Sequence, residues 1–115
     1  MTYQGSCHCG KIAYDVEGEI GPVTECNCSI CSKRGHLLWF VPRANLHLQT
    51  PEANLATYTF NKHNIRYAFC PTCGVGTFGL GTDPKGNAMA AINVRCLEGV
   101  DTKSLTVRPF DGRSL

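Results

Sequence analysis

Cys70-Pro71-Thr72-Cys73-Gly74 decides the fold of this chain, because it has the spacing of one half of a metal-binding knuckle. A second such half, Cys7-His8-Cys9-Gly10, lies near the beginning of the sequence. In both segments a glycine follows the second cysteine, and glycine adopts the left-handed conformation that turns backbone amides toward the sulfurs. The two segments together predict a closed, structural zinc site with four ligands: Cys7, Cys9, Cys70 and Cys73.

A third cluster, Cys26-Asn27-Cys28-Ser29-Ile30-Cys31, supplies three thiols and is followed by Ser32 where the other two have glycine. No fourth cysteine lies nearby in the sequence. Three protein ligands and an open position are typical of a reactive zinc rather than a structural one. The cluster therefore predicts a second metal site on Cys26, Cys28 and Cys31, with His36 and Cys96 as candidates for a fourth ligand.

The cellular compartment decides how the eight cysteines are interpreted. The opening residues 1–5 have neither a basic segment nor an apolar run, so we expect a cytoplasmic protein whose thiols stay reduced. The short spacings within the clusters also argue against a disulfide framework. We therefore expect two zinc ions per chain, the second site being more easily stripped and only partly occupied. A disulfide-stapled secreted domain and an iron–sulfur protein are the alternatives.

Charge and length limit the partners. The net charge is +2, from 11 basic and 9 acidic side chains, and no basic stripe suggests nucleic-acid binding. No stretch is long and apolar enough to suggest a membrane span. At 115 residues the chain is expected to form a single domain, 1–115.

Short alternating or apolar runs separated by glycine, proline and asparagine predict an all-β sandwich or partly open barrel with little helix. In residues 11–17, for example, Ile12, Tyr14 and Val16 fall on one face. The run at 36–41 is apolar throughout and predicts a buried strand. Single helical turns are expected at 29–34 and 101–105, and turns at 61–64 and 83–87. The other expected strands are 46–48, 55–60, 65–69, 77–80, 89–94 and 105–107.

The chain resembles the glutathione-dependent formaldehyde-activating enzyme family, which includes the centromere protein V type of domain. The resemblance rests on residues 5–10, 26–31, 69–74 and 92–101, in order and over nearly the whole chain. It implies a zinc-stapled β-sandwich of the β-tent type. It also implies that Cys7, Cys9, Cys70 and Cys73 hold a structural zinc, and that Cys26, Cys28 and Cys31 hold a catalytic one.

The activity implied by the resemblance is that of a carbon–sulfur lyase, which condenses glutathione with formaldehyde to S-(hydroxymethyl)glutathione. A three-thiolate zinc suits this use, since it holds a thiol substrate deprotonated as the nucleophile. No catalytic residue beyond the metal ligands is identified. Lys33, Arg34, Arg66 and Arg95 are either contacts for the carboxylates of glutathione or plain surface residues.

The alternative function is a protein-binding module in which both metals are structural, as in related zinc tents that bind small GTPases. The fourth position of the second site separates the two functions. An exchangeable ligand there favours the enzyme, whereas His36 or Cys96 as a ligand favours the module.

Overall fold

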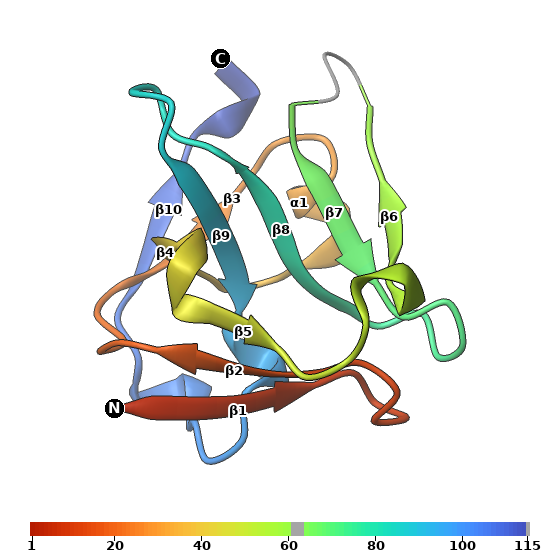
Figure 1. Ribbon diagram of the computed structural model, residues 1–115. Coiled ribbons are helices and arrows are strands. Elements are labelled where there is room, and N and C mark those ends of the chain that lie inside the picture. The colour runs from red at the N-terminus through yellow and green to blue at the C-terminus, as the bar shows by residue number, and fades with distance from the viewer. Residues whose placement is uncertain (61–63, 115) are drawn as a thin grey trace.

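The computed structural model describes residues 1–60 and 64–114, which form two β-sheets (Figure 1). The predicted all-β class, with short strands and little helix, is confirmed. Within the described residues, no helix is long and apolar enough to cross a membrane. The predicted polar turn at 61–64 falls, apart from Asn64, outside the described residues.

The small sheet consists of β1 (Thr2–Ser6), β2 (Ala13–Glu17) and β5 (Leu46–Leu48), in the order β1-β2-β5. Both pairings are antiparallel. The alternation predicted for residues 11–17 is confirmed, because Ile12, Tyr14 and Val16 are all buried. This sheet therefore presents one apolar face to the rest of the molecule.

The large sheet has the strand order β10-β3-β4-β9-β8-β7-β6. All its pairings are antiparallel except that of β10 with β3, which is parallel. The parallel pairing brings β10 beside the cluster of Cys26, Cys28 and Cys31, because Phe110 pairs with Cys26. The bounds are β3 (Val23–Cys26), β4 (Leu38–Pro42), β6 (Ala56–Tyr58), β7 (Arg66–Phe69), β8 (Gly76–Thr82), β9 (Ala88–Asn93) and β10 (Val107–Phe110).

Helical structure is confined to single turns. The one α-helical turn, α1 (Cys31–Arg34), ends at Gly35, whose φ of 69° is the left-handed conformation expected at a helix end. The predicted helical turns at 29–34 and 101–105 are thus both present, the second as a 3-10 turn. The described 3-10 turns are Arg43–Asn45, Glu52–Asn54, Val94–Cys96, Thr102–Ser104 and Gly112–Ser114.

The core lies where the two sheets face each other. The ring of Tyr14 from the small sheet meets that of Phe78 from β8 edge to face, with centroids 5.2 Å apart. Tyr3 and Trp39 form a second edge-to-face pair across the sheets, at 5.7 Å. These aromatic pairs join the two layers through buried apolar area and favourable ring geometry.

Four strand predictions need correction. The strand expected at 55–60 is shorter and covers only Ala56–Tyr58. The 36–41 run becomes β4, in which Trp39 and Val41 are buried but Phe40 is 52% exposed, because only one face of the strand meets the core. The strand expected at 77–80 extends over Gly76–Thr82, its glycines being accommodated inside the sheet. The last strand begins at Val107, two residues beyond the predicted start of 105–107. The strands β1 and β3 were not predicted.

Close packing of β1 onto β2 gives a test of this arrangement. A Cβ on Gly5 would lie 2.5 Å from Cε2 of Tyr14 and 3.0 Å from Cδ2 of Leu97. We expect Gly5→Ala to lower the free energy of unfolding by roughly 1–3 kcal/mol, through overpacking of the core. Gly21→Ala is the matched control, because no heavy atom lies within 4 Å of its Cβ position. Urea denaturation measures both, and equal midpoints would contradict the packing described here.

Candidate metal centres and the adjoining cavity

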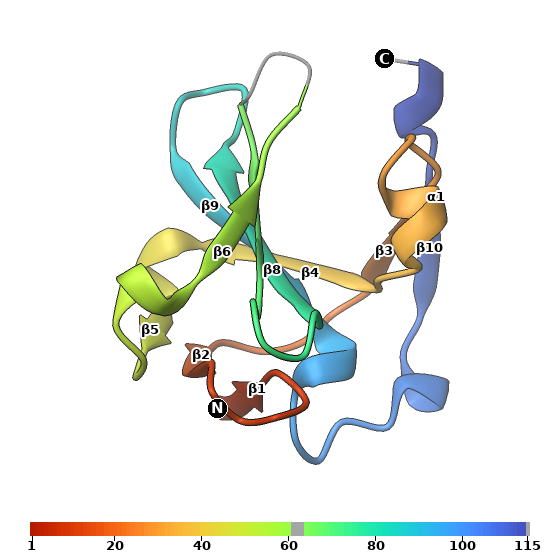
Figure 2. The ribbon, with the colours of Figure 1, turned by 90° about the vertical axis from the view of Figure 1, so that its right-hand side faces the viewer.

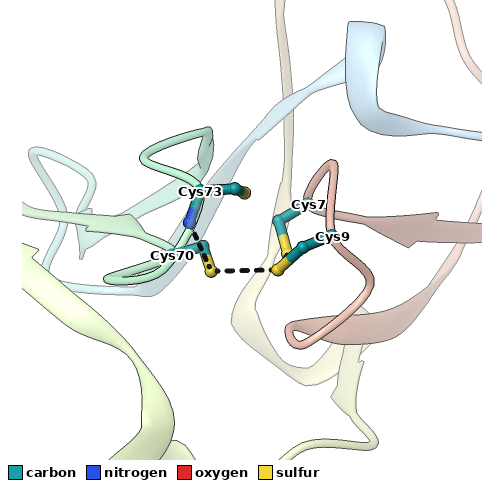
Figure 3. A group of neighbouring side chains, drawn as sticks. All are labelled: Cys7, Cys9, Cys70 and Cys73. Carbon is teal, nitrogen blue, oxygen red and sulfur yellow. Dashed lines mark hydrogen bonds between the residues drawn. The ribbon is translucent and has the colours of Figure 1, made fainter.

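The four-cysteine group lies between the two sheets. Cys7 and Cys9 follow β1 of the small sheet, whereas Cys70 and Cys73 follow β7 of the large one (Figure 3). All four sulfurs lie within 4.8 Å of one another. The Cys7–Cys9 and Cys9–Cys70 sulfur distances are 3.7 and 3.6 Å. A tetrahedral zinc with bonds of about 2.3 Å requires sulfurs about 3.8 Å apart, so the group fits zinc.

The backbone around this group has the form expected of metal knuckles. Gly10 and Gly74 have φ angles of 81° and 80°, in the left-handed region. The amides of Thr72 and Cys73 approach the Cys70 sulfur at 3.4 and 3.5 Å as donors. Such donors stabilise a thiolate, and the amides of Cys73 and Thr72 lower the pKa of Cys70.

The four-cysteine group is partly buried. Cys7 and Cys70 are 3% and 0% exposed, whereas Cys73 is half-buried and Cys9 is exposed. The amide of Ile12 donates to the Cys7 sulfur at 3.3 Å. The two knuckles are also tied directly, because Nζ of Lys11 donates to the hydroxyl of Thr72 at 3.2 Å. Four thiols leave a bound zinc no open position, so the group is suited to a structural role.

The three-cysteine group lies at the junction of a strand and a helical turn. Cys26 is the last residue of β3, Cys31 is the first residue of α1, and Cys28 lies in the loop between them. All three are half-buried, and their sulfurs lie within 4.8 Å of one another. Among the described residues, no histidine, cysteine or carboxylate joins the group as a fourth member, so His36 and Cys96 lie outside it. A metal held by these three thiols alone would have a fourth position left for another ligand.

Protonation couples to metal binding at this second group. Burial raises the pKa of Cys31 to about 12, and the neighbouring sulfurs of Cys28 and Cys26 act in the same direction. The metal-free thiol is therefore protonated at neutral pH. A metal must displace this proton, so its affinity for the site rises with pH.

The C-terminal turn holds the three-cysteine loop in place. The side chain of Asn27 donates to Asp111 at 3.0 Å and accepts from the amide of Arg113 at 2.9 Å. Gly112 faces the cluster so closely that a Cβ there would lie 2.7 Å from the Cys26 sulfur. This contact is not predictable from the sequence, because nothing in the two separate segments indicates that they meet.

A cavity of ≈ 510 Å³ adjoins the three-cysteine group. It lies between β3, β10 and α1 on one side and β8 and β9 on the other, with β4 running between them (Figure 2). Cys26, Cys28 and Cys31 all line it. Its other lining residues are Thr24, Arg34, His36, Leu38, Phe40, Ile65, Tyr67, Phe78, Gly79, Gly81, Thr82, Asp83, Pro84, Met89, Ala91 and Phe110.

Arg34 is the one Lys or Arg among the described cavity-lining residues. Its guanidinium lies 5.7 Å from the centroid of the Tyr67 ring, a cation–π contact. A Cβ on Gly76 would overlap this guanidinium, so the glycine makes room for it. The other candidates from the sequence, Lys33, Arg66 and Arg95, do not line the cavity.

His36 and Tyr67 enter the cavity as neutral hydrogen-bonding groups. Burial, and then the positive charges of Arg34 and Arg95, lower the pKa of His36 to about 4. Burial also raises the pKa of Tyr67 to about 12, with the cysteine thiolates adding to the effect. At neutral pH an uncharged imidazole and a protonated phenol therefore lie in the same cavity as the three thiols. No motif in the sequence indicates a role for Tyr67 beyond its place in an alternating strand.

Comparisons with known proteins agree with this geometry. The model of a family described as "Glutathione-dependent formaldehyde-activating enzyme" matches residues 2–109, which contain both cysteine groups. The crystal structure of a protein from Rhodobacter sphaeroides is also similar, with a TM-score of 0.78 and 27% sequence identity. The match covers 94% of this chain and 100% of that one.

Serine substitutions separate the expected roles of the two groups. Cys70→Ser removes a ligand from the closed group that joins the sheets, so we expect it to abolish cooperative folding of the zinc-loaded protein. Cys28→Ser should leave the domain folded with one metal fewer, because its group lies at the edge of a cavity. Cys96→Ser is the control, and should retain both metals because Cys96 belongs to neither group.

For all three variants, the zinc content per chain is measured after gel filtration and the stability by thermal melting. A folded Cys70→Ser protein with unchanged melting would contradict the structural role of the closed group. A Cys28→Ser protein that unfolded like Cys70→Ser would contradict the division between the two groups.

Proposed function

The chain belongs to the glutathione-dependent formaldehyde-activating enzyme family, and from this premise we propose that it is a zinc-dependent carbon–sulfur lyase. Residues 1–115 would act as one cytoplasmic domain on thiol adducts of small aldehydes, such as that of glutathione with formaldehyde. One observation supports the proposal above all others. The three-cysteine group has no fourth protein ligand among the described residues and lines a cavity of ≈ 510 Å³.

Two zinc ions per chain are proposed, one in each cysteine group. The closed group, Cys7, Cys9, Cys70 and Cys73, would hold the structural ion. Zinc on Cys26, Cys28 and Cys31 would supply a fourth position that keeps a thiol substrate deprotonated at neutral pH. Three thiolates give such a site a formal charge of −1, so it suits the binding of a thiol better than the activation of water.

Side chains of this protein can also stabilise the carbonyl oxygen of the aldehyde during the reaction. When the sulfur bonds to the aldehyde carbon, the π electron pair of the carbonyl moves onto its oxygen, which needs a hydrogen-bond donor and then a proton. The neutral imidazole of His36 and the phenol of Tyr67 are donors that line the same cavity. We propose that one or both face the aldehyde oxygen, since donors fixed before the reaction stabilise the charge that develops there.

The alternative function, a protein-binding module with two structural metals, requires a protein ligand at the fourth position. His36 and Cys96 are the two candidates from the sequence, and neither joins the three-cysteine group. This arrangement favours the enzyme over the module. It is also the point that experiment can address most directly.

Cobalt substitution tests the proposed thiol site. With both groups loaded with Co²⁺, we expect glutathione to shift the d–d bands of one of the two ions, because a thiol enters one coordination sphere only. S-methylglutathione, which lacks the thiol, is the ligand control, and Cys28→Ser is the protein control. Two tightly bound ions whose spectra ignore saturating glutathione would overturn the enzyme proposal and favour the module.

Arg34 is the proposed contact for a carboxylate of the substrate. Arg34→Gln should weaken glutathione binding roughly tenfold, the usual effect of losing a charge-assisted contact in a half-buried place. Its effect on uncharged 2-mercaptoethanol should be much smaller. Lys33→Gln is the matched control, since it removes the same charge from the neighbouring position of α1, outside the cavity.

The same cobalt titration measures these affinities. An equal loss for both thiols in Arg34→Gln would mean that Arg34 acts on the cysteine thiolates and not on a substrate carboxylate. An equal loss of glutathione affinity in both variants would mean that only the general charge of α1 matters.

A further inference from the structure

Much of the lining of the cavity is apolar. Leu38 and Phe40 of β4, together with Met89 and Ala91 of β9, contribute apolar side chains to it. Gly79 and Gly81 of β8 lie beside them and add no side chain. A water-filled cavity with such a lining gains free energy when an apolar group displaces the water.

The mouth of the cavity is also apolar. Phe40, Ile65 and Phe110 are 52%, 43% and 49% exposed, and all three line this cavity. Among the described residues only three other large apolar side chains are comparably exposed, at scattered places outside it: Met1, Tyr58 and Val107. Large apolar side chains gathered at the rim of a concave site indicate that the site binds an apolar group.

The flat shape of one wall depends on the two glycines. A Cβ on Gly81 would lie 3.3 Å from Cγ1 of Ile65, and one on Gly79 would lie 3.5 Å from Cγ2 of the same residue. Ile65 therefore packs directly against the β8 backbone. A side chain at either glycine would compete with Ile65 for this space, so the glycines allow Ile65 to line the cavity.

The charged groups of the cavity suit a ligand with an apolar group and few charges better than a ligand as highly charged as glutathione. Glutathione carries two carboxylates and an ammonium group, whereas the described residues that line the cavity offer one cation, Arg34, and one carboxylate, Asp83. Hydrogen bonds from the Asn87 side chain and nearby amides lower the pKa of Asp83 and keep it ionised. Arg34 can meet one carboxylate and Asp83 the ammonium group, but the second carboxylate has no cationic partner among these residues.

We propose that the adduct formed or cleaved at the three-cysteine site carries an alkyl or aryl substituent next to its sulfur, which fills the apolar cavity. This inference rests on the proposed function and names its substrate class. In the reaction a thiol S–H bond breaks and an S–C bond forms to the aldehyde carbon. The carbonyl π pair becomes a lone pair on oxygen, and the thiol proton ends on that oxygen. The substituent comes either from the thiol or from the aldehyde.

A series of simple thiols tests the cavity with constant ligation chemistry. Ethanethiol, butanethiol and hexanethiol differ only in apolar length, and each binds the cobalt-substituted protein through the same sulfur. Affinity should rise by up to about fourfold per methylene buried, and by about tenfold or more from ethanethiol to hexanethiol. Equal affinities along the series would contradict the proposal that the apolar substituent belongs to the thiol.

Two variants locate the effect. Phe40→Ala removes an exposed ring from the cavity and should flatten the dependence on chain length severalfold, with the smallest loss of affinity for ethanethiol and the largest for hexanethiol. Tyr58→Ala removes a ring of similar exposure, 53%, that does not line the cavity, and should leave the whole series unchanged. An equal effect of both variants would overturn the assignment of the chain-length dependence to this cavity.

A second arm distinguishes the source of the substituent. With glutathione fixed, the rates of adduct formation above background are compared for formaldehyde, butanal and benzaldehyde. A kcat/KM at least about tenfold higher for butanal and benzaldehyde would assign the apolar group to the aldehyde. A preference seen only among the alkanethiols would assign it to the thiol.

The outcomes also separate this inference from the function on which it rests. If glutathione shifts the cobalt bands but neither series depends on apolar size, the inference is wrong and the proposed function stands. If no thiol shifts the bands, the proposed function is wrong, and the inference falls with it.

Discussion

Both sheets depend on the meeting of four cysteine sulfurs between the ends of β1 and β7. These strands belong to different sheets and are 61 positions apart at Cys9 and Cys70, whose sulfurs lie 3.6 Å apart. A domain of 115 residues buries a modest share of its surface, so a metal tie at this point would add to the aromatic contacts between the sheets. The edge-to-face pair of Tyr14 and Phe78 lies between the same two layers.

The two cysteine groups use the same chemistry in different backbone settings. The closed group takes two cysteines from each of two glycine-ended knuckles, so four thiols converge from opposite sides. The three-cysteine group comes from a single loop between β3 and α1, and no second knuckle faces it. Its remaining side faces a cavity and the C-terminal turn, where Gly112 packs against Cys26. Local loop geometry supports three ligands there, and the fold leaves the fourth direction open.

The sequence predicts what depends on neighbours along the chain, and little of what depends on distant pairing. The knuckle glycines, the alternating face of β2 and the turn of α1 follow from spacing and local conformation, and all are found. The strand β4 shows the limit. A run that is apolar on both faces predicts a buried strand, but Phe40 and Leu38 line a cavity instead of the core. An apolar side chain looks the same in sequence whether protein or a ligand covers it.

The cavity likewise depends on contacts between distant segments. Phe110 reaches it because β10 pairs in parallel with β3, and Tyr67 because β7 lies two strands from β9. Gly76 links the two cysteine groups most directly. It lies three residues beyond Cys73, and its carbonyl accepts a hydrogen bond from Asn93 at 3.1 Å, while Arg34 and His36 pack over its missing Cβ. The knuckle that closes one group thus sets the backbone on which the cation and the imidazole beside the other group rest. The contact between the sheets therefore also helps to position Arg34 and His36 in the cavity beside the three-cysteine group.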